Sequence, residues 1–215
     1  SSLRSSFSQL VSLGHQLISM TTSAGRIMAV ESLPEETTEV PEGLEVEETL
    51  DVVMERVSFR YQDGDPVLEP FDFIARDGDL IAVIGPSGEG KTTLLRLLLG
   101  LVQPHSGKAA LRGGSGTNYF INAGTRKVFA YVPQGNSVFS GTIGENLRLV
   151  RPDATDAELE EVLKIACAWD FVSTFPDGLN HPLKAGGRGV SEGQAQRLAI
   201  ARALLRKAPI LLLDE

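Results

Sequence analysis

The feature that most constrains this sequence is a glycine-rich loop between an apolar run and a leucine-rich run. Residues 81–84 are apolar, and the pattern G-x-x-x-x-G-K-T then occupies residues 85–92. This order predicts a strand, a phosphate-binding loop and a helix that begins near the lysine. The glycines allow successive backbone N–H groups to point inward and form an anion-sized nest at the helix N-terminus. The alternative interpretation is a glycine-rich turn that contains a lysine by chance.

The side chains around this loop suit nucleotide chemistry. Lys91 would reach the β- and γ-phosphates of a nucleotide, and the Thr92 hydroxyl would ligate Mg²⁺. Phosphoryl transfer also requires an acidic residue at the end of a neighbouring buried strand, directed at the metal ion. The apolar run 210–213 ends in Asp214, and Glu215 directly after it would polarise the attacking water. The alternative for these two residues is an acidic cap on a strand end.

The composition narrows the class of protein. A chain of 215 residues suffices for one good-sized domain and an appendage. Its net charge of −8 disfavours nucleic acid as the main partner, because phosphate backbones require a basic face. The single cysteine, Cys167, excludes an internal disulfide and fits a reducing compartment. It lies in an apolar helical pattern, so we expect it to be a buried small residue.

Two observations concern membranes and the ends of the chain. No apolar run reaches the roughly 18 residues that a membrane-spanning helix requires, and the N-terminus carries no cleavable signal peptide. The chain begins at Ser1 without Met and stops at Glu215, so we expect it to be a piece of a longer polypeptide.

The sequence divides into three parts. Residues 1–30 predict a long helix with a narrow apolar stripe, formed by Leu3, Phe7, Leu10, Leu13, Leu17, Met20, Ala24 and Ile27. Such a helix must pack against a partner outside this chain or, alternatively, against the chain's own domain. Residues 31–48 contain eight glutamates and predict a solvated, semi-extended linker without chemistry of its own. Residues 49–215 form the remaining domain.

Periodicity and turn residues predict the elements of that domain. They are, in chain order, an edge strand or hairpin arm at 50–61, a turn at 63–66, a strand at 71–75, a turn at 77–78, a buried strand at 80–84, a helix at 91–101, a small β region at 108–133, a short helix at 140–150, helices at about 155–170 and 191–207, and a buried strand at 210–213. Thr155 and Ser191 open their helices with capping-box spacing. Buried strands carried between helices predict an α/β domain with a largely parallel sheet.

Several motifs resemble one family in the order in which that family carries them. Residues 190–206 and 210–215 resemble the signature helix and second Walker motif of ATP-binding cassette (ABC) ATPases. Tyr131-Val-Pro-Gln134 resembles the Q-loop, and residues 138–147 are similar to the segment that follows it in ABC exporters. Ser58-Phe-Arg-Tyr61 resembles the aromatic A-loop. Because the motifs occur in register over nearly the whole chain, together they are far more specific than any one of them.

The resemblance extends to the N-terminal part and implies an architecture. Residues 23–27 and the acidic linker look like the join between an exporter's last transmembrane helix and its nucleotide-binding domain. The fold that this implies is that of a P-loop NTPase, with a largely parallel sheet, a small N-terminal β region and an inserted helical subdomain. The long amphipathic helix of residues 1–30 would precede it, as the cytoplasmic end of the last transmembrane helix.

The resemblance also implies roles for individual residues. Tyr61 would stack on the adenine of ATP, and the phosphates would be held by Gly85, Pro86, Ser87, Gly88, Glu89, Gly90, Lys91, Thr92 and Thr93. The Mg²⁺ site would comprise Thr92, Gln134 and Asp214. Glu215 would act as the general base, with Gln134 and Lys91 as the other catalytic residues. The alternatives are an ordinary strand aromatic for Tyr61 and a polar strand-end residue for Gln134.

The signature segment implies a partner. Ser191, Gly193 and Gln194 would face the γ-phosphate of ATP bound by a second nucleotide-binding domain, in a homodimer or a heterodimer. A helix N-terminus with a serine cap is an anion site, which agrees with that role. ATP would then join two cassettes head to tail, and hydrolysis would release them.

Three departures from the family pattern bear on activity. Glu192 stands where the usual signature has glycine, and Ala185 stands at the position of a glutamate that exporters usually carry. The chain also stops before the D-loop and the switch histidine of the family, and none of His15, His105 and His181 can be that histidine. We therefore expect this polypeptide by itself to bind nucleotide poorly and to hydrolyse it hardly at all.

The sequence as a whole predicts the ATP-hydrolysing motor domain of an ABC exporter, on the cytoplasmic face of the plasma (inner) membrane. The intact protein would couple Mg²⁺-dependent ATP hydrolysis to export of a solute through its transmembrane domain, and nucleic acid would not be a partner. Two alternatives remain at this point. One is a soluble ABC ATPase of DNA repair or translation, and the other is a regulatory cassette that binds ATP without hydrolysing it.

Overall fold

A computed structural model describes residues 2–33, 35–36, 38–44, 49–62, 64–86, 88–135, 137–184 and 189–214. The side chains of residues 2–6 and 10 lie outside that description. The chain separates into two compact units, residues 1–36 and residues 37–215. Each unit is described by itself below.

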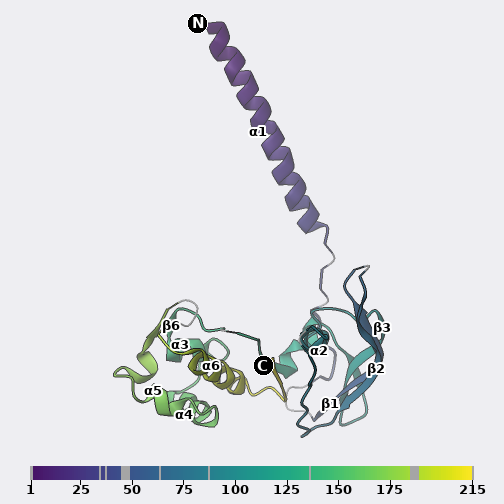
Figure 1. The fold of residues 1–215 in the computed structure, drawn as a ribbon, viewed down its shortest axis with the longest axis vertical. Helices are drawn as coiled ribbons and strands as arrows, with labels where there is room; N and C mark the ends of the chain where they lie inside the picture. The colour runs from purple at the N-terminus through teal and green to yellow at the C-terminus, as the bar shows by residue number, and fades with distance from the viewer. Residues whose placement is uncertain are drawn as a thin grey trace. The chain divides into compact units, whose positions relative to one another are not determined.

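The first unit is a single long helix, α1, at Ser2–Glu31 (Figure 1). It confirms the helix predicted from the apolar stripe. Described stripe residues such as Phe7 and Met20 are about 70% exposed. Among the described residues, no helix is both long enough and apolar enough to cross a membrane.

The second unit begins with a segment that attaches to the β region. Residues 38–43 are largely exposed, as predicted for the acidic linker, but Leu44 is only 3% exposed and belongs to the hydrophobic core. The Tyr119 hydroxyl donates to the Gly43 carbonyl at 3.0 Å, and the Lys127 ammonium donates to the Leu44 carbonyl. Residues 43 and 44 of the predicted linker are therefore anchored to the domain rather than solvated.

A four-stranded antiparallel sheet forms the β region, in the order β2-β1-β3-β4. Its strands are β1 at Leu50–Arg60, β2 at Pro66–Ala75, β3 at Ser106–Gly113 and β4 at Asn118–Phe120. The predicted hairpin arm at 50–61 is confirmed, since β1 pairs with β2, but β1 is an inner strand rather than an edge strand. Asp63 of the predicted turn lies outside the described residues, and Gly78 turns the chain after β2 with φ +80°.

A short parallel pair lies beside this sheet. Strands β5, at Phe129–Val132, and β8, at Ile210–Leu213, pair in parallel, and Tyr131 stands opposite Leu212. The helix α2, at Lys91–Leu98, follows the glycine loop as predicted. Between β4 and β5 the chain forms a 3₁₀ helix, η1, at Ala123–Val128.

The buried strand predicted at 80–84 is wrong for this structure. These residues form no strand, and Leu80 and Ile84 are 100% and 90% exposed. The strand at 210–213 does form, but only Leu212 is buried, while Leu211 and Leu213 are 40% and 51% exposed. A wholly apolar run becomes a strand buried on both faces only where neighbours flank it and layers cover both faces. In the described part of the chain the parallel sheet consists of β5 and β8 alone.

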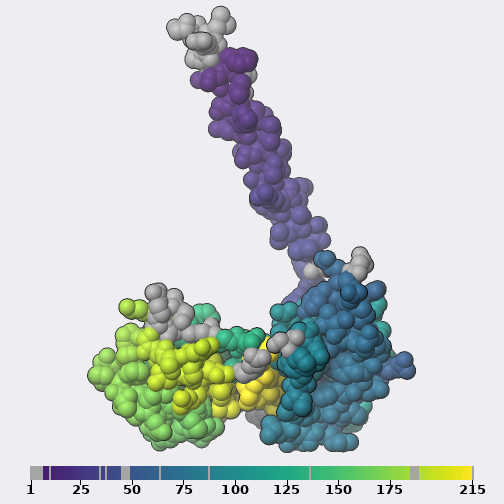
Figure 2. Space-filling view, viewed as in Figure 1, coloured from purple at the N-terminus to yellow at the C-terminus, as the bar shows by residue number. Residues whose placement is uncertain are grey.

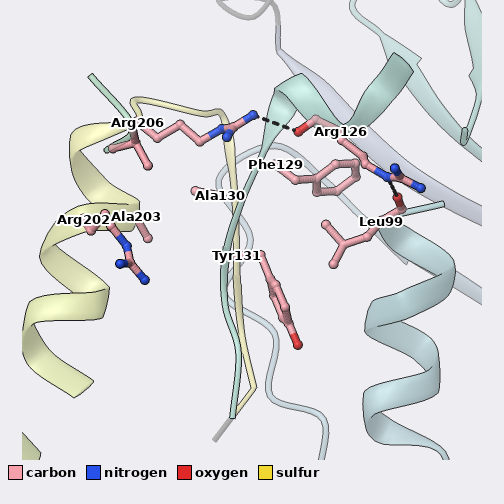
Figure 3. A pocket seen from close by; sticks show the side chains of 9 residues that line it. Leu99, Arg126, Phe129, Ala130, Tyr131, Arg202, Ala203 and Arg206 are labelled. Carbon is pink, nitrogen blue, oxygen red and sulfur yellow. Dashed lines mark hydrogen bonds between the residues drawn. The ribbon is translucent and has the colours of Figure 1, made fainter. Parts of the chain in front are cut away.

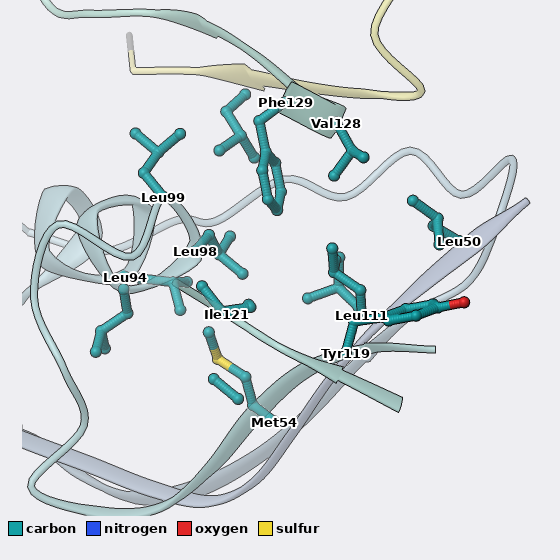
Figure 4. Close-up of a cluster of buried hydrophobic side chains, with 14 of the residues drawn as sticks. Leu50, Met54, Leu94, Leu98, Leu99, Leu111, Tyr119, Ile121, Val128 and Phe129 are labelled. Carbon is teal, nitrogen blue, oxygen red and sulfur yellow. The ribbon is translucent and has the colours of Figure 1, made fainter. Parts of the chain in front are cut away.

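One hydrophobic cluster joins the β region to α2 (Figure 4). Met54 and Leu111 point into it from the sheet, Leu94 and Leu98 enter it from α2, and Phe129 enters it from β5. This packing fixes the start of α2, and therefore the glycine loop, against the antiparallel sheet.

A second cluster builds the inserted helical part, which forms one continuous body in green and yellow-green (Figure 2). Its elements are α3 at Ile143–Arg148, α4 at Asp156–Ile165, α5 at Trp169–Val172, η2 at Gly178–Asn180 and α6 at Glu192–Leu205. Strands β6, at Gly141–Thr142, and β7, at Pro182–Leu183, pair within it. The alanines Ala199 and Ala203 of α6 pack against Ala130 of β5.

The helix predicted over 155–170 is interrupted. Both predicted capping boxes are present, at Thr155 and at Ser191. However, α4 ends at Ile165 and Cys167 adopts a left-handed φ of +52° before α5 begins. Cys167 is consequently exposed, which corrects the expectation of a buried residue. The apolar periodicity of the sequence continues across the turn at Cys167, so it gave no sign that the helix ends there.

Candidate functional site

The glycine loop leaves the N-terminus of α2 open. Gly90 occupies the N-cap position with φ +87°, and no side chain caps the first turn. The backbone N–H groups of that turn are therefore available to an anion, as expected at an uncapped helix N-terminus. The Lys91 ammonium folds back over the loop and donates to the carbonyls of Gly85 and Pro86, each at 2.8 Å.

The loop also approaches the antiparallel sheet closely at Gly90. A Cβ at this position would lie 2.7 Å from Leu68 Cδ2 and 3.1 Å from the Val67 carbonyl oxygen. Only glycine combines this close approach with a left-handed φ at little cost. Gly88 has a similar φ, +89°, but nothing lies within 4 Å of the corresponding point.

Asp214 lies next to the first turn of α2, although it is 122 residues from Thr92 in the chain. The Thr92 hydroxyl donates to Asp214 Oδ1 at 3.2 Å, and the Tyr131 hydroxyl approaches Oδ2 at 3.2 Å. The Asp214 backbone N–H donates to the Val132 carbonyl at 3.0 Å and continues the β5–β8 pairing. Asp214 is 7% exposed. The predicted pair of oxygen ligands, a threonine hydroxyl and a strand-end carboxylate, is thus brought together.

Burial raises the pKa of the Tyr131 hydroxyl, and the nearby Asp214 carboxylate raises it further. Tyr131 is therefore protonated at neutral pH, and its hydroxyl donates a hydrogen bond to Asp214 Oδ2. Two hydroxyl groups from separate elements, α2 and β5, satisfy a carboxylate that has little access to water. A buried charge without such partners would be strongly unfavourable.

Tyr61 lies at the end of β1 beside the same helix. Its hydroxyl is 3.3 Å from the Thr93 hydroxyl and accepts a 2.9 Å hydrogen bond from the Arg96 guanidinium. Its ring meets Phe59 edge-on, with centroids 4.7 Å apart, and 42% of the residue is exposed. The hydrogen bond with Thr93 lowers the pKa of Tyr61, and Arg96 lowers it further through its hydrogen bond and its charge.

The predicted signature residues form a well-defined helix start. Ser191 Oγ accepts from the Gln194 N–H at 3.3 Å, and Gln194 Oε1 accepts from the Ser191 N–H at 2.8 Å. Ser191, Glu192 and Gly193 are exposed. The hydrogen bonds described for Ser191 and Gln194 join these two residues to each other and to the first turn of α6.

Other predicted residues have a more limited description. Gln134 is exposed beyond the end of β5, and Glu89 approaches Gly85, where an added Cβ would lie 2.8 Å from Glu89 Oε2. Ser87, Ala185 and Glu215 lie outside the described residues, so their predicted roles stay predictions.

Two participants in the site were not predicted from sequence, Arg96 and the hydroxyl of Tyr131. Arg96 is three residues after Thr93 on a helix, a spacing that places both on one face and could have indicated a shared partner. Tyr131 was included only as part of a Q-loop motif. Its position opposite Leu212, two residues before Asp214, depends on the strand register, which the sequence does not define.

A cavity of about 210 Å³ lies beside β5, and Phe129, Ala130 and Tyr131 of that strand are among the residues that line it (Figure 3). Arg126, Arg202 and Arg206 line it, and each binds backbone or hydroxyl oxygens. The Arg126 guanidinium donates to the carbonyls of Leu99 and Gly100, just beyond the end of α2. Arg126 therefore connects η1 to the end of α2, and Arg202 and Arg206 connect α6 and the residue after it to Ser137 and to η1.

The chain is similar in sequence to ABC transporter proteins. A family model described as ABC transporter matches residues 68–215. A probable ABC transporter ATP-binding/permease protein of Haemophilus influenzae is 33% identical over 217 residues, which cover 99% of this chain and 39% of that protein. The ATP-dependent lipid A-core flippase of Neisseria meningitidis is 39% identical over 166 residues, which cover 74% of this chain and 27% of the flippase.

A solved structure is similar over most of the chain. The structure of a bacterial Atm1-family ABC exporter with ATP bound superimposes with a TM-score of 0.79 and 31% identity, over 91% of this chain and 34% of that one. This chain spans between a quarter and two-fifths of the curated relatives compared here. The mixed α/β fold with its P-loop, preceded by a long helix, confirms the predicted fold class. The largely parallel sheet of that prediction is not seen in the described residues, where most strand pairs are antiparallel. The chain belongs to the ABC transporter family.

Proposed function

We propose that this chain is the ATP-binding and ATP-hydrolysing motor domain of an ABC exporter. The observation that carries the proposal is the contact between Thr92 and Asp214, 3.2 Å apart across 122 residues of sequence. It places a strand-end carboxylate beside the hydroxyl that follows the loop lysine, which is the arrangement that P-loop ATPases use. A glycine-rich turn with a chance lysine would not require this long-range contact.

ATP would bind along the start of α2. The open first turn of α2 would receive the phosphates through its N–H groups, and Lys91 would exchange its loop carbonyls for phosphate oxygens. Tyr61 would offer its exposed ring to the adenine, and Thr93 lies within reach of its hydroxyl. The loop would thus bind the phosphates chiefly through backbone groups and one mobile cation.

Thr92, in the first turn of α2, and Asp214, directly after β8, are suited to bind a magnesium ion. Thr92 Oγ1 and Asp214 Oδ1 are both oxygen donors, the kind that Mg²⁺ prefers, and the carboxylate supplies negative charge. When bound together with ATP, Mg²⁺ would neutralise charge on the β- and γ-phosphate oxygens. Thr92 and Asp214 would hold it, with Gln134 as the third predicted member of the site.

Hydrolysis would proceed by in-line attack of water on the γ-phosphate. Glu215, directly after Asp214, would take the proton of that water as general base, and Gln134 would help to position it. Lys91 would stabilise the charge that develops on the transferred phosphoryl group. Positioning and charge neutralisation would supply most of the acceleration.

The proposed function includes partners. Ser191 caps an exposed helix N-terminus, an anion site to which a second nucleotide-binding domain would bring the phosphate of its ATP. The intact protein would include a transmembrane domain, with this domain on the cytoplasmic side of the membrane. Relatives named as permease, flippase and exporter favour this proposal over a soluble ATPase of DNA repair or translation.

ATP hydrolysis by the intact protein tests this proposal. Glu215→Gln should lower turnover by at least about 100-fold while ATP binding persists, because general bases typically contribute that much. Lys91→Ala should weaken ATP binding itself. Equal, slow hydrolysis by the parent and Glu215→Gln would instead indicate a cassette that binds ATP without working on it.

A further inference from the structure

We infer that Tyr131 is a positioning residue for Asp214, whose carboxylate its hydroxyl holds in the orientation that faces Thr92. The inference rests on the proposed function, because it assumes that Asp214 serves a Mg²⁺ ion. It adds a residue of β5 to a site otherwise made by the glycine loop, α2 and β8.

The strand register places Tyr131 where it can act. Tyr131 stands opposite Leu212 in the parallel pair, and Asp214 follows Leu212 by two residues, so both side chains lie on the same face of the sheet. The Tyr131 ring runs alongside the strands, and its hydroxyl points away from the arginines of the cavity (Figure 3). That direction leads to Asp214 Oδ2, at 3.2 Å.

The two hydroxyl donors bind different oxygens of the Asp214 carboxylate. Thr92 binds Oδ1 and Tyr131 binds Oδ2, each at 3.2 Å, so rotation of the carboxylate would break both hydrogen bonds. Thr92 is itself a predicted metal ligand and would exchange its bond with Oδ1 for the ion. Tyr131 is on the opposite oxygen and would keep its bond when the metal binds.

This arrangement has a physical consequence for metal affinity. A ligating carboxylate is oriented by its other hydrogen bonds, and removal of such a partner typically lowers metal affinity 10–100-fold. Tyr131 should therefore affect the contribution of Mg²⁺ to nucleotide binding, and leave metal-free nucleotide binding unchanged.

The test compares the affinity of the intact protein for an ATP analogue with a fluorescent ribose label, in Mg²⁺ and in EDTA. The ratio of the two dissociation constants gives the advantage that the metal provides. For Tyr131→Phe we expect the dissociation constant in EDTA to equal that of the parent, and the Mg²⁺ advantage to fall by about 10-fold.

A double-variant comparison shows whether Tyr131 acts through Asp214. Asp214→Asn should remove most of the Mg²⁺ advantage, and the combination of Tyr131→Phe with Asp214→Asn should lose no more than Asp214→Asn alone. Tyr119→Phe is the matched control, since it deletes a hydroxyl bound to the Gly43 carbonyl, away from the site. We expect both dissociation constants to be unchanged in this control.

Each other outcome decides against one of the two proposals. An unchanged Mg²⁺ advantage in Tyr131→Phe, or independent losses in the double variant, would overturn the positioning role. A parent protein without affinity for the analogue in either buffer would overturn the proposed function, and the inference with it. Should Tyr131→Phe fail to give a cooperative melting transition, Tyr131→Met takes its place with the same expectation.

Discussion

Gly88 and Gly90 have the same backbone conformation but different surroundings. Both hold left-handed φ values, +89° and +87°. A side chain at Gly88 would enter open space, whereas one at Gly90 would meet Leu68 and the Val67 carbonyl. A substitution at Gly88 therefore measures the free-energy cost of the left-handed backbone conformation alone, and the same substitution at Gly90 adds the cost of a steric clash.

We expect Gly88→Ala to lower the free energy of unfolding by about 1–2 kcal/mol, the usual cost of a left-handed conformation for a residue with a Cβ. Gly90→Ala should cost about 1–3 kcal/mol in addition, because its Cβ would overpack the loop against β2. Urea unfolding of this chain, followed by circular dichroism, measures both. Equal losses in the two variants would mean that the loop can move away from β2 freely.

At the scale of the element, Arg202 connects α6 to the segment that follows β5. Its guanidinium donates to the carbonyl and the hydroxyl of Ser137, at 3.0 and 2.8 Å, and stacks over the exposed Phe139 ring. Burial lowers the pKa of this guanidinium. A partly buried cation that donates to a loop carbonyl holds that loop firmly in place, because hydrogen bonds to charged groups are stronger than neutral ones.

Arg202→Ala should lower the free energy of unfolding by about 1.5–3 kcal/mol, because it removes charge-assisted hydrogen bonds and leaves the Ser137 carbonyl without this donor. Arg197→Ala is the matched control on the same helix. Arg197 also donates to backbone carbonyls, of Gly193 and Cys167, and stacks over Phe171, but it is exposed. Thermal melts of both variants should show the larger shift for Arg202→Ala.

Elements with local determinants were predicted well from the sequence. The capping boxes at Thr155 and Ser191, the helix after the glycine loop and the turn at Gly78 depend on neighbouring residues, and the structure contains all of them. The strand at 80–84 depends on partners elsewhere, and its apolar pattern alone did not produce it. The break at Cys167 was missed because a left-handed residue there leaves the apolar periodicity intact.

The candidate site shows the same division. Its loop and its acidic strand end could be identified as motifs, since each is a contiguous pattern. Tyr131 and Arg96 could not be identified in this way, because their roles depend on which strand lies beside which and on which helix face meets β1. The register of β5 with β8, and the face of α2 that meets β1, are set only when the whole domain has folded.

At the scale of the whole molecule, residues 39–44 of the acidic segment are part of the second unit. Leu44 is buried among Leu50, Leu111 and other core residues, and Gly124 leaves room for the backbone of Glu39, whose carbonyl oxygen would lie 2.2 Å from an added Cβ. The chain from residue 39 to residue 44 is thus fixed to the β region at more than one point.

Leu44→Ala should lower the free energy of unfolding by about 2–5 kcal/mol, as for other large-to-small changes in a core. Val40→Ala is the control, since Val40 is 49% exposed and its truncation should have little effect. Denaturant titrations of this chain distinguish the two. Similar midpoints for Leu44→Ala and the parent would mean that the segment is not part of the folded core.

The 122 residues between Thr92 and Asp214 also set a time during synthesis. At about 5–20 residues per second, a ribosome adds Asp214 between about 6 and 24 s after Thr92. During that interval the glycine loop has been made, but its carboxylate counterpart does not yet exist. If the proposed function holds, metal-dependent ATP binding can begin only after β8 has been translated and has paired with β5.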